Sequence, residues 1–136
     1  MFPATTARRM AYEATSYVVY LPHRPVVLRV GRLPPVLPWG AARGAVFVTA
    51  WNPLGRAGAR ADNVRAGRRL RAALVRAGLR AAAGEGRGDR GDWPAERSLL
   101  VFGLARGPAA ALGRRWRQNA VLWVARGLPV RLLPLR

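Results

Sequence analysis

Apolar runs alternate along the chain with segments rich in glycine, proline or arginine, and their spacing predicts the secondary structure. The run Val46–Ala50 is short, β-branched and aromatic, which favours a buried strand. It is followed by Asn52-Pro53, where proline removes a backbone donor and disfavours helical geometry for its predecessor. We therefore predict a central strand here, followed by a loop over residues 54–61.

The next segment has the period of an amphipathic helix that begins near Asp62. Asp62 offers the acceptor and the negative charge that suit a helix N-terminus. Ala66, Leu70 and Leu74 share one arc, while arginines occupy the other side, so we expect this helix to pack on a sheet. Asn63 falls within the apolar arc and therefore needs a hydrogen-bond partner, either in the preceding loop or in a ligand.

The remaining runs predict hairpins at both ends of the chain and a second helix. The predicted strands are residues 17–21, 26–30, 46–50, 79–83, 99–104, 120–124 and 130–135, and the predicted helices are residues 62–77 and 108–118. Residues 1–10 have no periodicity, so we expect a flexible leader over residues 1–12 and then one domain over residues 13–136. This order predicts an α+β fold, a two-layer sandwich of a mainly antiparallel or mixed sheet with two helices on one face.

The charge of the chain is unusual for its size. The 136 residues have a formal net charge of +18, and all 24 basic residues are arginine. Abundant Ala, Gly and Pro favour a coding bias as the origin of this charge, although a positive field attracts polyanions whatever its origin. The absence of cysteine excludes disulfides and thiolate sites, and the single histidine, His23, cannot build a multi-histidine metal site. Since we find neither a membrane-spanning apolar stretch nor a secretory signal, we expect a bacterial, cytoplasmic protein.

Residues 84–96 form a glycine-rich segment with four of the six carboxylates of the chain. The four are Glu85, Asp89, Asp92 and Glu96. We predict a flexible loop here and expect it to be the main functional surface. One hypothesis is a metal-assisted hydrolase or phosphoryl-transfer enzyme that uses these carboxylates to bind Mg²⁺. Because Arg87 and Arg90 lie in the same segment and would neutralise them, we assign no catalytic constellation, metal or cofactor.

Several polar landmarks follow one another along the chain. They are Thr49-Ala50-Trp51-Asn52-Pro53, Asn63 with Leu70, Gly84-Glu85-Gly86, Trp93-Pro94 with Glu96, Ser98-Leu99-Leu100-Val101 and Gln118-Asn119-Ala120-Val121-Leu122-Trp123. In this order they resemble the bacterial domain-of-unknown-function family 3293, over residues 17–133. The resemblance implies a single small domain and no assigned activity. Arg117 departs from the pattern, because a small residue is expected immediately before Gln118.

The landmarks are mostly amides, glycines and carboxylates rather than core hydrophobes. We hypothesise that the polar ones converge at one edge of the sheet and form a ligand-binding cluster. Its members would be Asn52, Asn63, Glu85, Glu96, Gln118 and Asn119. The competing interpretation is that these groups cap helix ends and tie loops together, as buried amides do in many domains.

Nucleic-acid association is an alternative function. It would use the arginine surface of the first predicted helix, formed by Arg65, Arg68, Arg69 and Arg76. A solvated surface produced by coding bias explains the same pattern, and we find no nucleic-acid-binding motif. A third hypothesis is a partner that docks on Leu33–Trp39 or on the C-terminal edge strand. The sequence specifies neither a partner nor an oligomeric state.

Overall fold

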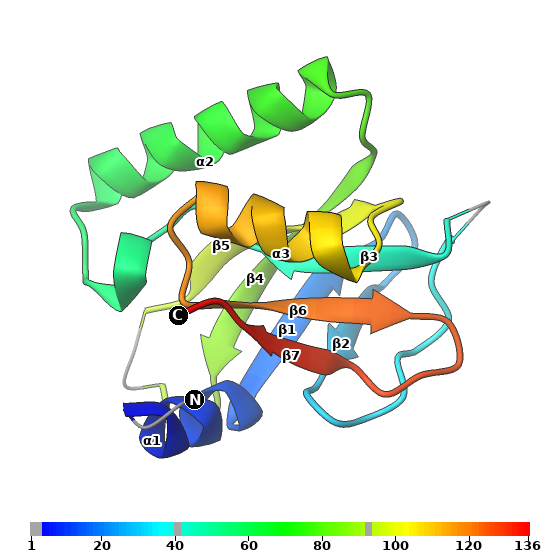
Figure 1. Cartoon of the computed structure of the whole chain (residues 1–136), viewed down its shortest axis with the longest axis horizontal. Coiled ribbons are helices and arrows are strands. Elements are labelled where there is room, and N and C mark those ends of the chain that lie inside the picture. Colours follow the sequence, from blue (N-terminus) through cyan, green and yellow to red (C-terminus); the bar gives the residue numbers. More distant parts are fainter. Residues whose placement is uncertain (1–3, 40–41, 92–93) are drawn as a thin grey trace.

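The computed structural model describes residues 4–39, 42–91 and 94–136. In these residues, seven strands form one antiparallel sheet that is accompanied by three α-helices (Figure 1). The elements in chain order are α1 (Ala4–Glu13), β1 (Thr15–Tyr20), β2 (Pro25–Leu28), β3 (Gly44–Val48), the 3₁₀ helix η1 (Pro53–Gly55), α2 (Arg60–Arg76), β4 (Ala81–Gly88), β5 (Glu96–Phe102), α3 (Arg106–Arg115), β6 (Ala120–Ala125) and β7 (Arg131–Pro134).

The strand order is β2-β1-β4-β5-β3-β6-β7. Its centre is a β-α-β-β-α-β unit, in which α2 connects β3 to β4 across β5, and α3 connects β5 to β6 across β3. The β1–β2 hairpin extends this unit beside β4, and β7 extends it beside β6 as an edge strand. Both helices of the unit lie on the same face of the sheet (Figure 1). The predicted hairpins at both ends of the chain and the predicted C-terminal edge strand are therefore confirmed.

The helix-covered face holds one of two hydrophobic cores. Strand alternation directs Val46, Val48 and Val101 to this face, where they meet the apolar stripes of α2 and α3. Leu70 of α2 is buried there, and so is Ala109 of α3. The stripes predicted from the helical period are thus the ones that pack on the sheet.

A second core fills the opposite face, because the sheet curls around it. Tyr17 and Phe47 meet there edge to face with ring centroids 5.3 Å apart. The curl brings the segment after β2 to the segment before β7, where the Gly31 N–H donates to the Val130 carbonyl and the Val130 N–H donates to the Arg32 carbonyl, both at 2.8 Å. Leu37 and Trp39 are also buried in this core, so the proline-rich segment is in part structural.

The α+β class and the antiparallel sheet are confirmed, but a two-layer sandwich with two helices is too simple a description. The sheet is curled and has a core on both faces, and a third helix, α1, lies at the end of the sheet where β1 begins (Figure 1). This helix occupies most of the predicted leader, and Tyr12 packs against the second core. The division into a leader and one domain stays a prediction.

The glycine-rich segment is the main correction to the predicted fold. Residues 84–88 are not a loop but the second half of β4, which pairs with β1 and β5. At Gly84 a Cβ atom would lie 2.5 Å from the Val18 carbonyl oxygen and 2.9 Å from the Phe47 ring. Glycine is required at this position because the Val18 backbone and the Phe47 ring lie too close for a side chain, and not because the chain turns. Asp92 and Trp93, which belonged to the predicted loop, lie outside the described residues.

Candidate functional site

Asn52 and Asn63 hold the end of β3 against the start of α2. Asn52 has a left-handed backbone with φ 49°, a conformation that asparagine adopts more readily than most residues. Its N–H donates to Asn63 Oδ1, and Asn63 Nδ2 donates to Asn52 Oδ1, each at 2.9 Å. Both residues are buried, with exposures of 7% and 5%. The amide predicted within the apolar arc of the helix therefore has its partner in the preceding loop.

Glu96 adds the start of β5 to this pair, and we call the side chains of Asn52, Asn63 and Glu96 the strand-end network. Asn52 Nδ2 donates to Glu96 Oε2. Asn52 Oδ1 also accepts the Gly58 N–H at 2.9 Å, so this oxygen already has two donors. Because the amide groups are engaged with one another and with the backbone, the strand-end network has the properties of a structural tie.

Gln118 and Asn119 lie beside the strand-end network and make a second tie. Gln118 Nε2 donates to the Trp51 and Trp116 carbonyls at 3.3 and 3.1 Å. Asn119 packs against Gly55, where a Cβ would lie 2.7 Å from Asn119 Nδ2. Arg117, which stands where the family resemblance leads us to expect a small residue, has φ 59°. This value lies in the left-handed region that favours glycine. Five of the six predicted cluster residues are thus gathered at one end of the sheet.

Glu85 does not join them, which corrects the predicted cluster. Gly86 pairs with Glu96 while Glu85 pairs with Arg97, so alternation along β4 and β5 sends Glu85 and Glu96 to opposite faces of the sheet. Glu85 faces α2, and Glu96 lines a small cavity of about 60 Å³ on the other face beside Tyr12 and Tyr17. Burial raises the pKa of the Tyr17 phenol, so it stays neutral there.

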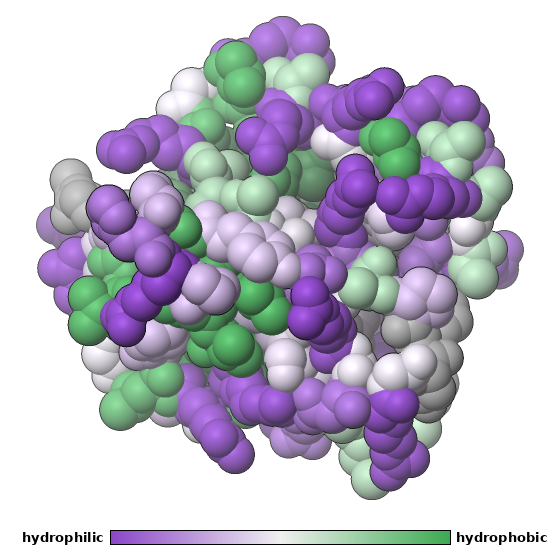
Figure 2. Space-filling model, turned by 180° about the vertical axis from the view of Figure 1, so that it is seen from behind, coloured by the Kyte–Doolittle hydropathy of each residue, from purple (hydrophilic) through white to green (hydrophobic). Residues whose placement is uncertain are grey.

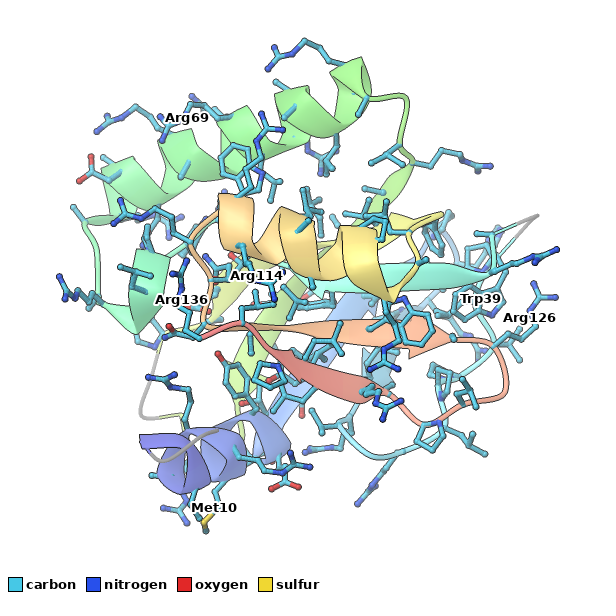
Figure 3. All side chains as sticks on the ribbon, viewed as in Figure 1. Met10, Trp39, Arg69, Arg114, Arg126 and Arg136 are labelled. Atoms are coloured by element: carbon cyan, nitrogen blue, oxygen red, sulfur yellow. The ribbon has the colours of Figure 1, made fainter. Side chains whose placement is uncertain are left out.

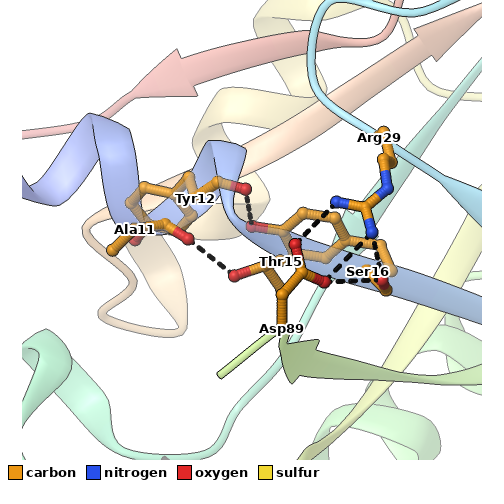
Figure 4. Close-up of polar contacts among 7 residues, drawn as sticks. Ala11, Tyr12, Thr15, Ser16, Arg29 and Asp89 are labelled. Carbon is orange, nitrogen blue, oxygen red and sulfur yellow. Dashed lines mark hydrogen bonds and ion pairs between the residues drawn. The ribbon is translucent and has the colours of Figure 1, made fainter. Parts of the chain in front are cut away.

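Asp89, a third carboxylate of the predicted loop, forms an ion pair with Arg29. The Arg29 guanidinium forms a forked pair with the Asp89 carboxylate at 2.9 and 3.0 Å, and the Ser16 hydroxyl donates to it at 3.0 Å (Figure 4). Arg29 and Ser16 hold the pKa of Asp89 below its ordinary value. This contact ties the end of β4 to the β1–β2 hairpin. Among the described residues, no three histidine, aspartate or glutamate side chains form a group that could hold a metal ion.

A cleft of about 590 Å³ lies between α2 and strands β4 and β5, and we call it the α2 cleft. Trp51, only 6% exposed, lies at its base. Gly67 of α2 faces this tryptophan, since a Cβ on Gly67 would lie 3.5 Å from the indole nitrogen. The absence of a side chain at this position leaves room between the helix and the sheet.

Three of the six polar or charged side chains that line the α2 cleft are basic. The six are Arg68 and Arg71 from α2, Arg97 from β5, Glu85 from β4, Tyr20 from β1 and Ser98 from β5. Arg97 lies over the Trp51 ring, 6.0 Å from its centroid, and Arg60 lies 5.8 Å from the same centroid. In the part of the chain that the structure describes, Arg68, Arg71 and Arg97 form no ion pair.

Glu85 is fixed at the wall of this cleft. Its Oε1 accepts the Tyr20 hydroxyl and an Arg87 N–H, the latter at 2.8 Å. The Tyr20 and Arg87 hydrogen bonds hold the pKa of Glu85 below its ordinary value of 4.5, so it is a carboxylate near neutral pH. The same bond to Glu85 raises the pKa of Tyr20 and keeps its hydroxyl protonated.

The predicted arginine surface is divided by the fold. Arg65 pairs with Asp62, Arg68 lines the cleft, and Arg69 projects from the outer side of α2 (Figure 3). Hydrophilic side chains are also spread over much of the rear of the molecule, with smaller hydrophobic areas among them (Figure 2). Net charge therefore does not locate a site. Sequence reasoning did not select Arg71, Arg97 or Tyr20 for the cleft, because only the packing of α2 on β4 and β5 brings them together.

A comparison with protein-family models gave a match over the centre of the chain. The family model described as "Protein of unknown function (DUF3293)" matches residues 48–121. This range is shorter than the span expected from the resemblance, but it runs from the end of β3 to the start of β6. It contains the strand-end network and every residue of the α2 cleft except Tyr20. Neither the curated proteins nor the solved structures gave a match.

Proposed function

The chain belongs to this DUF3293 family of proteins of unknown function, and from that premise we propose that it binds a phosphate-bearing ligand in the α2 cleft. The observation that carries the proposal is the presence of Arg68, Arg71 and Arg97 in one cleft without an ion-pair partner among the described residues. Guanidinium groups are the side chains best suited to phosphate oxygens, because they present several donors in a fixed plane.

The size of the α2 cleft suits a small ligand. Ligand sites commonly have volumes of about 300–1,000 Å³, and the cleft measures about 590 Å³. The phosphate could belong to a free metabolite or to the backbone of a nucleic acid, and the guanidinium chemistry is the same for both. A bacterial, cytoplasmic setting is part of this proposal. In the described residues, no helix is both long and apolar enough to cross a membrane.

The strand-end network and the loop carboxylates support other functions less well. The amides of the network are already engaged within the protein. Metal-assisted chemistry at the predicted loop is weakened as a hypothesis because Glu85 and Glu96 face opposite sides of the sheet and Asp89 pairs with Arg29. The nucleic-acid hypothesis also relies on arginines that bind phosphate groups, so the experiment below includes DNA and RNA as ligands.

The test is isothermal titration with inorganic pyrophosphate at about 50, 150 and 300 mM salt. The variant Arg68→Gln/Arg71→Gln removes two charges from the cleft. The matched control Arg114→Gln/Arg115→Gln removes two charges from exposed positions in the last turn of α3. We expect the cleft variant to bind at least about tenfold more weakly and the control to stay within about twofold of the wild type, since a hydrogen bond to a charged group contributes about 1.5–3 kcal/mol.

An equal loss in both variants would contradict the proposal, because binding would then follow the overall field. Fluorescence anisotropy with labelled DNA and RNA forms the second arm. If the cleft variant loses oligonucleotide binding at about 150 mM salt but pyrophosphate binds neither protein, the phosphate belongs to a nucleic acid. Circular dichroism of all variants checks that the fold is retained.

A further inference from the structure

We infer that Glu85 makes the α2 cleft selective for phosphate esters that carry free hydroxyl groups, such as a sugar phosphate or a ribonucleotide. The inference rests on the proposed function, since it concerns the same cleft. Phosphate binding alone does not explain why an acidic residue lines this cleft. Among the described lining residues, Glu85 is the only acid, and it shares the cleft with three arginines that form no ion pair with a described residue.

A carboxylate in this position works against a bare anion. Glu85 is ionised near neutral pH and repels any phosphate that the arginines attract. A cleft for inorganic phosphate alone would bind more tightly without it. The carboxylate favours ligand binding only if it receives hydrogen bonds from another part of the ligand, because an ionised carboxylate has acceptor capacity and no donor.

Glu85 has an oxygen for this purpose. Both described hydrogen bonds to its side chain, from Tyr20 and from Arg87, end on Oε1. In the described part of the chain, no hydrogen bond reaches Oε2, and the side chain keeps an exposure of 19%. The Tyr20 and Arg87 contacts hold the carboxylate from two adjacent strands, β1 and β4, so its orientation is set before a ligand binds.

The charge of the cleft selects the kind of donor. A ligand ammonium group would also pair with a carboxylate, but here it would approach Arg68, Arg71 and Arg97 and be repelled by them. A neutral hydroxyl group carries no such penalty. The combination of several guanidinium groups with one fixed carboxylate therefore matches a ligand with a phosphate at one end and hydroxyl groups at the other.

The experiment compares three phosphates by isothermal titration at about 150 mM salt: inorganic phosphate, methyl phosphate and ribose 5-phosphate. The test variant is Glu85→Gln, and the matched control is Asp62→Asn, which also removes one negative charge but lies on α2 beside Arg65 and does not line the cleft. Adenosine monophosphate and its 2′-deoxy analogue, titrated in parallel, distinguish a nucleotide from a simple sugar phosphate as the source.

We expect wild-type protein to bind ribose 5-phosphate roughly tenfold more tightly than methyl phosphate, in line with hydrogen bonds to a charged group. Glu85→Gln should weaken ribose 5-phosphate by a similar factor and at the same time strengthen inorganic phosphate severalfold, because the repulsion is removed. Asp62→Asn should change neither. This opposite response of two ligands to one substitution cannot arise from a loss of folding.

Two results with the Glu85→Gln variant would overturn the inference. One is that Glu85→Gln strengthens all three phosphates alike, in which case Glu85 only repels anions. The other is that the substitution leaves all three unchanged. If inorganic phosphate and methyl phosphate bind the wild type but ribose 5-phosphate binds no more tightly, the inference fails while the proposed function stands. If none of the phosphates binds and the cleft variant keeps the oligonucleotide binding of the wild type, the proposed function itself fails.

Discussion

Substitution of Asn63 by alanine is the sharpest test of whether the strand-end network is structural. Asn63 is 5% exposed, and both of its described side-chain hydrogen bonds go to Asn52. Alanine removes the acceptor of the buried Asn52 N–H and the donor to Asn52 Oδ1. The N–H is then left without a partner, whereas the oxygen keeps the Gly58 N–H.

These losses set the expected size of the effect. A buried donor without an acceptor costs about 1–3 kcal/mol, and the lost amide bond to a still-satisfied oxygen adds about 1 kcal/mol. The free energy of unfolding should therefore fall by about 2–4 kcal/mol. For a domain of this length, each kcal/mol corresponds to roughly 3–5 °C, so Tm should fall by roughly 6–20 °C.

Urea denaturation, with the midpoint and the slope fitted together, measures this loss directly. The matched control is Asn119→Ala, which truncates a nearby half-buried amide. The side chain of Asn119 makes no described hydrogen bond, so this substitution should lower the free energy of unfolding by less than about 1 kcal/mol. A loss below about 0.5 kcal/mol in Asn63→Ala would refute the reasoning. If phosphate binding disappeared in that same stable variant, the network would be a ligand site.

Three further substitutions test the fold and its charge contacts. Gly84→Ala should lower the free energy of unfolding by more than about 2 kcal/mol in thermal melts, because its Cβ would overlap the Val18 backbone. The control is Gly107→Ala in the first turn of α3, where the Cβ would have open space, and this variant should be neutral or slightly stabilising. Arg117→Gly should stabilise by about 1 kcal/mol in urea titrations, since it relieves a left-handed backbone. The pKa of Asp89 is depressed by Arg29, so its contribution to stability is complete above the ordinary value of 3.8 and is lost as the pH falls below it. Asp89→Asn should therefore flatten the decline in Tm below about pH 4, and an unchanged slope would contradict this role.

The buried strands were predictable from the sequence because their chemistry is local. The apolar runs of β3, β5 and β6 are continuous and rich in aliphatic and aromatic residues, as expected for strands buried on both faces. Strand β4 was not recognised in full, since alanine and glycine have low strand propensity. Its conformation is set by pairing with β1 and β5, which is a tertiary effect. Helix α1 was not predicted either, and the packing of its Tyr12 against the second core is likewise a tertiary contact.

The candidate site was likewise predictable only where local sequence patterns determine it. The sequence placed Asn52 at the end of a strand and Asn63 at the start of the next helix, and the structure joins the two by hydrogen bonds. Glu85 was placed wrongly because its segment was interpreted as a loop, where the alternation that separates it from Glu96 does not apply. The α2 cleft depends on residues from three strands and one helix, among them Arg97 and Tyr20. No local pattern indicates their convergence.

The most direct test of phosphate binding in the α2 cleft is an NMR titration that follows the tryptophan indole signals. Trp51 lies at the base of the cleft beneath Arg97, and Trp123 and Trp39 serve as internal references, because Arg106 and Arg126 lie over their rings at 5.9 and 5.8 Å. Binding in the cleft predicts a saturable shift of the Trp51 indole signal on addition of ribose 5-phosphate at about 150 mM salt, with small and linear shifts at both references. Equal, unsaturated shifts at all three tryptophans would show that the ligand only samples exposed arginines, and would contradict the account.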